Sequence, residues 1–187
     1  VLFNLAGPEQ NGFYAAAVRI SEAFVVLLLS VSAVAAAHFG RLASAPDAQV
    51  QRDLQRFYRN MLVSGLAISA FISFAAEPIV LAVYGPHFEP TVPILRVHAW
   101  TFVLVAVSVG LEPWFYHHGR LTQYVAKTLV TLIFCVPTVI GATHFFGPVG
   151  TAGAVVATYA VSVFATNILL PGARDAFRFQ VRAFQRR

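Results

Sequence analysis

The sequence has few charged residues and almost no cysteine or lysine. Charged side chains make up 11% of its 187 residues, Cys135 is the single cysteine, and Lys127 is the single lysine. Because one thiol can form neither an intrachain disulfide nor a cysteine cluster for a metal, both are excluded. Soluble domains carry roughly 25% charged residues, so this composition does not fit a water-exposed globule.

The sequence also lacks the local patterns that accompany catalysis. It contains no HExxH, no Gly-rich phosphate loop after a strand and no Ser/His/Asp set in a recognisable context. His117 and His118 are adjacent, but a metal site needs more ligands than these two. We therefore expect no enzyme activity, no cofactor and no bound metal.

Long apolar segments dominate the chain instead. Hydrophobic residues account for 58% of the sequence, and the mean hydropathy is +0.69. A membrane-spanning helix needs about 20 mainly apolar residues, and the strands of a membrane barrel alternate polar and apolar residues. The apolar segments reach helical length and do not alternate, which predicts an all-α fold: a polytopic transmembrane bundle of about five spanning helices, at residues 13–39, 61–84, 91–111, 124–146 and 152–170.

The predicted organisation is a transmembrane helical domain over residues 1–172 and a basic amphipathic tail over residues 173–187. In the tail, basic residues recur every four positions and apolar residues form a second stripe: Arg174, Arg178, Arg182 and Arg186, against Phe177, Val181 and Phe184. Such a helix lies along an anionic lipid surface. A solvated basic tail has the same pattern, and the sequence leaves both interpretations open.

The distribution of basic residues predicts an orientation. Three alternate connections hold four, two and five basic residues, with Arg120 and Lys127 in the second, whereas the opposite connections hold only Arg96. Basic loops remain on the cytoplasmic side, so these three connections and the C-terminus are expected there. The net charge of +5 is confined between apolar runs rather than spread over a polar surface, so no nucleic-acid partner is expected.

Three polar residues within the apolar segments are the candidate substrate-binding residues. Arg19 and Glu22 lie three positions apart, share one helix face and can pair. A charge at the bilayer centre costs about 2.5–3.5 kcal/mol, so these side chains either reach outward to the interface or face a hydrophilic cavity that takes a polar or anionic cargo. Asn167 either joins two helices or lines the same cavity.

Small residues recur every four positions in two of the segments. Such stripes allow helix backbones to approach closely within lipid. They predict a packed bundle rather than independent anchors, with contacts along Gly65, Ser69 and Ser73 and along Ala154, Thr158, Ser162 and Thr166.

The order of four motifs resembles that of a known transporter superfamily. The multidrug/oligosaccharidyl-lipid/polysaccharide superfamily has similar motifs in its polysaccharide and lipid-linked oligosaccharide exporters. The motifs in this chain are NGFYAAAVRISE, EPIVLAVYGPHFEPTVPILRVHAW, HHGRLTQYVAKTLV and FFGPVGTAGAVVATYAVSV. The resemblance covers residues 7–170 and matches the C-terminal half of such transporters, which have 12 or 14 helices in two bundles.

The resemblance implies a flippase of the bacterial inner membrane. Its cargo would be an undecaprenyl-linked glycan, and Arg19 would lie where members of this family attract the pyrophosphate. A drug or cation antiporter of the same superfamily and a non-transporting membrane subunit are the alternatives. The chain starts with Val1 and no signal peptide precedes its first apolar run, so we expect it to begin inside a longer protein whose N-terminal half is missing here.

Overall fold

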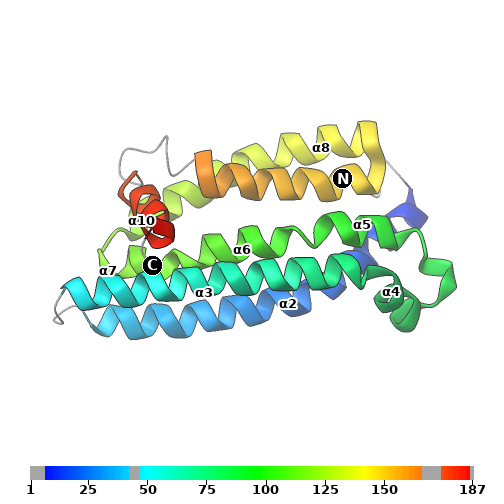
Figure 1. Cartoon of the computed structure of the whole chain (residues 1–187). Helices are drawn as coiled ribbons and strands as arrows, with labels where there is room; N and C mark the ends of the chain where they lie inside the picture. Colours follow the sequence, from blue (N-terminus) through cyan, green and yellow to red (C-terminus); the bar gives the residue numbers. More distant parts are fainter. Residues whose placement is uncertain (1–6, 43–46, 166–173, 186–187) are drawn as a thin grey trace.

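The computed structural model describes residues 7–42, 47–165 and 174–185, and every element within these ranges is a helix (Figure 1). The expected all-α class is therefore confirmed. Within this part of the chain, four helical stretches are long and apolar enough to cross a membrane: Pro8–Arg41, Ala48–Phe74, Thr91–His117 and Leu121–Phe164. The fourth reverses direction midway, so the chain runs along the bundle five times (Figure 1).

Helix α2 (Pro8–Arg41) starts and ends at residues suited to helix termini. Gly7 precedes it with φ of 88°, Pro8 occupies the first helical position, Glu9 lies in the first turn and Arg41 in the last. The missing N–H of Pro8 costs nothing there, and both charges complement the helix dipole. At 34 residues the helix is about 51 Å long, which exceeds the hydrocarbon thickness of a bilayer.

The predicted segment 61–84 is divided between two helices, α3 (Asp47–Phe74) and α4 (Ala76–Tyr84). Proline lacks an N–H, and its ring collides with the carbonyl group four residues earlier. For Pro78 that carbonyl belongs to Phe74, the last residue of α3, so the chain bends at Ala75.

The path from Thr91 to His117 forms the centre of the bundle. A short 3₁₀ turn, η1 (Pro86–Phe88), leads into α5 (Thr91–His98), α6 (Thr101–Gly110) and α7 (Glu112–His117). Helices α2, α3 and α8 (Leu121–Ala160) all pack against this path. Pro113 cannot donate to Val109, and the break between α6 and α7 falls at Leu111, between these two residues.

Helix α8 folds back on itself at Gly147, as the FFGPVG sequence predicts. Gly147 has φ of 59° and ψ of −148°, and Pro148 follows it. The two arms of α8 meet beside this turn, where the hydroxyls of Thr143 and Thr151 lie 2.8 Å apart. A π-helical turn, η2 (Val161–Ala165), continues the second arm.

The predicted stripes of small residues lie in helix contacts. Gly65 faces α6 so closely that an added Cβ would lie 2.5 Å from the Cβ of Ala106. The hydroxyl of Ser69 accepts a hydrogen bond from the Val103 N–H at 3.1 Å. On the second stripe Ala154, Thr158 and Ser162 are buried, and Thr166 lies outside the described residues.

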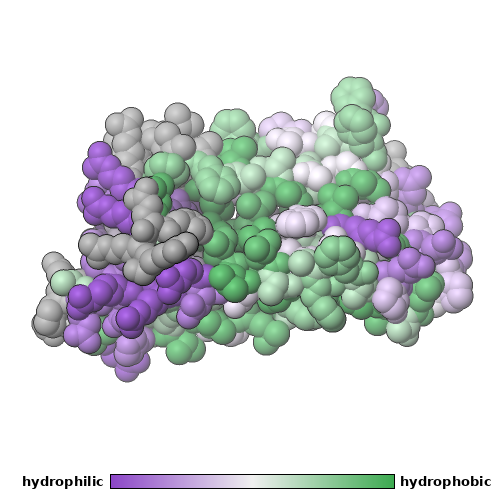
Figure 2. Space-filling model, in the orientation of Figure 1, coloured by the Kyte–Doolittle hydropathy of each residue, from purple (hydrophilic) through white to green (hydrophobic). Residues whose placement is uncertain are grey.

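The outside of the bundle carries an apolar band between more polar ends (Figure 2). Apolar side chains of α2, α3 and α8 are exposed along it, among them Val34, Phe71, Ile133 and Phe134. The end where α2 stops and α3 begins also holds α7 and α10 (Arg174–Gln185) (Figure 1). Arg52, Arg120 and Arg178, one from each of the three predicted cytoplasmic connections, therefore lie on elements that meet at one end of the bundle.

Helix α10 contacts the bundle through a different stripe from the one expected to face lipid. Ala176, Phe179 and Ala183 are buried, and the Phe179 ring lies 6.0 Å from that of Tyr58 on α3. Of the predicted stripe, Val181 is exposed and Phe177 half-buried, while the side chain of Phe184 lies outside the described ones. Docking on α3 thus leaves part of the second apolar stripe uncovered.

Candidate functional site

A pocket of about 440 Å³ lies between α2, α6, α7 and both arms of α8. Its apolar walls come from every one of these helices except α7, as expected for a cavity inside a bundle of spanning helices. Polar side chains gather along α6, α7, α8 and η2: Ser108, Glu112, Tyr124, Lys127, Thr128, Thr131, Thr158, Tyr159 and Ser162. A pocket of this size, with apolar walls and a few polar groups, is typical of a small-molecule site.

Lys127 is the most unusual side chain in the pocket. It is 2% exposed although most of its neighbours on α8 face outward. No atom of the described residues accepts a hydrogen bond from its Nζ. An ammonium group inside an apolar bundle lowers the stability of the fold unless an anion or another acceptor reaches it. The position of Lys127 therefore indicates either a bound ligand or a charge with a functional role.

Glu112 supplies the opposite charge in the same pocket. Its Oε1 accepts a hydrogen bond from the hydroxyl of Tyr124, a residue that lies one turn before Lys127 on α8. Its Oε2 lies 3.2 Å from the hydroxyl of Ser32 on α2. The carboxyl group is thus fixed by two helices, while Lys127, on α8 in the same pocket, has no bonded acceptor among the described residues.

The Ser32 hydroxyl determines how Glu112 can be bonded. A hydroxyl carries one proton, and Ser32 directs its own at the Val109 carbonyl oxygen, 2.6 Å away. Glu112 Oε2, at 3.2 Å, is a second acceptor for the same proton, so the Val109 carbonyl oxygen and the Glu112 carboxyl group compete for it. The pocket therefore combines a carboxyl group that has few donors with an ammonium group that can attract an anionic group.

Two of the three sequence-predicted residues, Arg19 and Glu22, do not line this pocket. Arg19 and Glu22 are exposed on α2. Leu28, which is buried, follows Arg19 by nine residues or about 180° of helix rotation, so Arg19 lies on the outer face. Within the described residues no ion pair joins Arg19 to Glu22, and Asn167 lies outside them.

His98 is buried but has a local partner. Its Nδ1 lies 3.0 Å from the hydroxyl of Ser21 on α2, and its ring meets Tyr14 edge-on at 6.2 Å. These contacts join α5 to α2. In the described part of the chain no three His, Cys, Asp or Glu residues come close enough to hold a metal ion.

The sequence alone does not predict these positions of Lys127 and Glu112. Near the end of an apolar segment, Lys127 is expected in a connection, and Glu112, at the end of segment 91–111, is expected as a boundary residue. The missed signal is a polar stripe at helical spacing: Tyr124, Lys127, Thr128, Thr131 and Cys135 follow i, i+3, i+4, i+7 and i+11. A polar face within an apolar helix indicates a cavity.

Comparisons with protein families, with characterised proteins and with solved structures found no match for this chain.

Proposed function

We propose that the chain is part of a membrane transporter that moves lipid-linked oligosaccharide precursors across the bacterial inner membrane. The observation that carries the proposal is the buried ammonium group of Lys127 in a pocket between apolar helices. A lipid-linked glycan carries phosphate groups beside its sugars, and those anionic groups are the ligands that such a cation attracts. The motif resemblance supplies the cargo class.

The proposed arrangement has the basic end of the bundle, including α10, in the cytoplasm. Sugar and phosphate groups would use the polar wall of the pocket while the lipid tail remains in the bilayer. One bundle does not enclose an alternating-access path, so a second bundle is proposed to complete it. The exposed face of α2, with Arg19 and Glu22, is then available to the second bundle.

The test is export of surface polysaccharide in cells that depend on the complete transporter. Lys127→Met keeps the length of the side chain and removes its charge, so we expect at least a tenfold fall in export and accumulation of lipid-linked precursor at normal protein abundance. Arg59→Gln, an exposed residue of α3, is the matched control and should export normally. Unchanged export in Lys127→Met would contradict the proposal.

Arg19→Ala tests the predicted cargo role of Arg19 separately. If the outer face of α2 lines the transport path of the complete transporter, this variant also lowers export at normal abundance. If Arg19 only reaches to the interface, export stays normal while Lys127→Met remains defective. The two variants therefore distinguish an inner site from one on the outer face of α2.

Glu112 favours a second candidate function, a proton- or cation-coupled antiporter. The carboxyl group lies in a pocket between apolar helices and accepts a hydrogen bond from the Tyr124 phenol, and acidic groups within spanning helices mark proton and ion pathways. An antiporter should lose resistance to toxic cations in Glu112→Gln. A flippase without such coupling should keep its export in this variant. If neither assay responds to any of these variants, the third alternative, a membrane subunit without transport activity, is favoured.

A further inference from the structure

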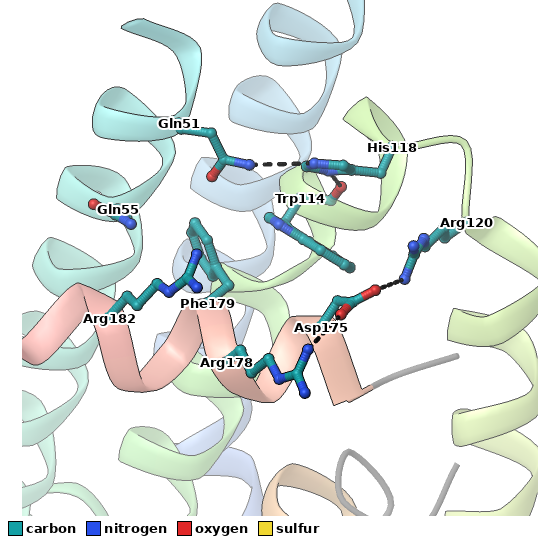
Figure 3. Close-up of a pocket in the computed structure, with 9 residues that line it drawn as sticks. All are labelled: Gln51, Gln55, Trp114, His118, Arg120, Asp175, Arg178, Phe179 and Arg182. Carbon is teal, nitrogen blue, oxygen red and sulfur yellow. Dashed lines mark hydrogen bonds and ion pairs between the residues drawn. The ribbon is translucent and has the colours of Figure 1, made fainter. Parts of the chain in front are cut away.

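A second pocket lies at the basic end of the bundle, where α3, α7 and α10 meet (Figure 3). Its volume is about 570 Å³, within the roughly 300–1,000 Å³ that is usual for ligand sites. It is separate from the pocket that contains Lys127, since the two share no lining residue.

The floor of this second pocket is apolar and well packed. Trp114 and Phe179 are 3% and 5% exposed, and their ring centroids lie 6.1 Å apart. His118 stacks on Trp114 at 4.4 Å and lies 3.2 Å from the side-chain amide of Gln51. With the amide donating to Nε2, Nδ1 of His118 donates to the Trp114 carbonyl oxygen at 2.8 Å.

The rim of the second pocket carries three arginines and one acid. Arg120 donates to Asp175 at 2.9 Å, and Arg178 approaches the other oxygen of the same carboxylate at 3.7 Å. Arg182 lies one turn further along α10 and is exposed. Two of the three guanidinium groups share the one carboxylate, so the rim keeps an excess of positive charge.

We infer that this second pocket binds the phosphate group of an anionic phospholipid. Arginine forks match the geometry of phosphate oxygens, and basic pockets beside spanning helices hold anionic headgroups. The Arg120 guanidinium lies 5.5 Å from the centre of the Trp114 ring and is thereby oriented toward the rim. The inference does not depend on the proposed transport function.

The position of the pocket favours a lipid over free phosphate. Helices α7 and α10, which line it, lie at the end of the bundle (Figure 1) that carries a polar surface beside the apolar band (Figure 2), the level of headgroups for a bundle that spans a bilayer. On α10 the exposed Val181 lies next to Arg182, and the half-buried Phe177 next to Arg178. A lipid can therefore place its phosphate on the arginines and its glycerol and acyl chains on the adjoining apolar stripe.

The test uses the fluorescence of Trp114 in the purified full chain, in neutral detergent. Trp100→Phe leaves Trp114 as the single tryptophan and defines the reference protein. Short-chain phosphatidylglycerol should change its fluorescence saturably, and short-chain phosphatidylcholine should not. In Arg178→Gln/Arg182→Gln the apparent Kd for phosphatidylglycerol should rise at least tenfold.

The matched control is Arg52→Gln/Arg59→Gln, which removes two exposed arginines of α3 that do not line the pocket. Its apparent Kd should stay within twofold of the reference. Equal weakening in both double variants would mean that only overall charge matters and would overturn the site. An equal response to both lipids would also overturn it, and saturation by inorganic phosphate alone, at the lipid's own concentrations, would overturn the lipid as the source of the phosphate.

Discussion

The two segments Thr91–His117 and Leu121–Phe164 contain almost equally apolar windows of 18 residues, but these windows occupy opposite environments. The mean hydropathies of the two windows are 1.8 and 1.9, yet 67% of the first window is buried inside the bundle and only 6% of the second. In water this arrangement would be unstable, because the Leu, Ile and Phe side chains of the second segment would be exposed to solvent. In a bilayer both positions are favourable, so hydropathy alone cannot distinguish the centre of the bundle from its lipid-facing surface.

The largest effect is expected when one phenylalanine side chain is removed from each segment. Phe102 on α6 is 0% exposed and contacts Phe24 on α2, whereas Phe134 on α8 is 54% exposed. Phe102→Ala leaves a cavity and should lower the free energy of unfolding by about 3 kcal/mol. Phe134→Ala removes mainly contacts with the surrounding lipid or detergent, so it should lower the free energy of unfolding by less than about 1 kcal/mol. Unfolding in mixed detergent micelles measures the free energy of unfolding of both variants. Equal losses would contradict the assignment of Phe102 to the interior of the bundle and of Phe134 to its outer surface.

A smaller effect is expected from adding one methyl group to a glycine in each environment. At Gly65 an added Cβ would lie 2.5 Å from Ala106 and 3.0 Å from the Phe102 carbonyl oxygen, so Gly65→Ala should cost about 2 kcal/mol as α3 and α6 separate. At Gly141 on α8 nothing lies within 4 Å, and Ala is the better helix former. Gly141→Ala should therefore be neutral or stabilising in the same titration. Destabilisation of similar size in both variants would mean that the outer surface of α8 is packed.

The smallest effect is expected at an exposed pair on the otherwise buried segment. Arg96 and Glu77 approach to 3.4 Å, with about half of each side chain exposed. Exposed ion pairs contribute little, so Arg96→Gln should lower the free energy of unfolding by less than about 0.5 kcal/mol. Arg56→Gln, which breaks the exposed pair with Asp53 on α3, is the control and should behave alike. A loss above 1 kcal/mol for Arg96→Gln alone would show that Arg96 has a buried role.

Much of the fold could be predicted from the sequence because long apolar segments and glycine-proline turns act locally. The all-α class, the reversal at Gly147 and the close contact at Gly65 are confirmed. The division of 61–84 at Ala75 follows from Pro78, whose effect on Phe74 could have been anticipated. Which apolar segment lies at the centre could not be predicted, since the most apolar windows of the two candidates differ by only 0.1 in mean hydropathy.

The candidate site was harder to predict because it depends on contacts between distant residues. Glu112 is fixed by Ser32, 80 positions away, and that contact leaves no local pattern. The position of Lys127 on a polar helix face could have been predicted, since the polar residues around it on α8 have helical spacing. Whether Arg19 and Glu22 contribute to transport stays a prediction for the export assay.

The account depends above all on α8 presenting its outer face to lipid while α6 lies inside the bundle. Single nitroxide labels at Ile133 (70% exposed) and Val107 (5% exposed), in a Cys135→Ser background and in lipid vesicles, test this directly. Collisions with molecular oxygen, which concentrates in the bilayer, should be frequent at Ile133 and rare at Val107. Collisions with a water-soluble nickel chelate should be rare at both. Frequent collisions with the nickel chelate at Ile133 would place that surface in water and contradict the account.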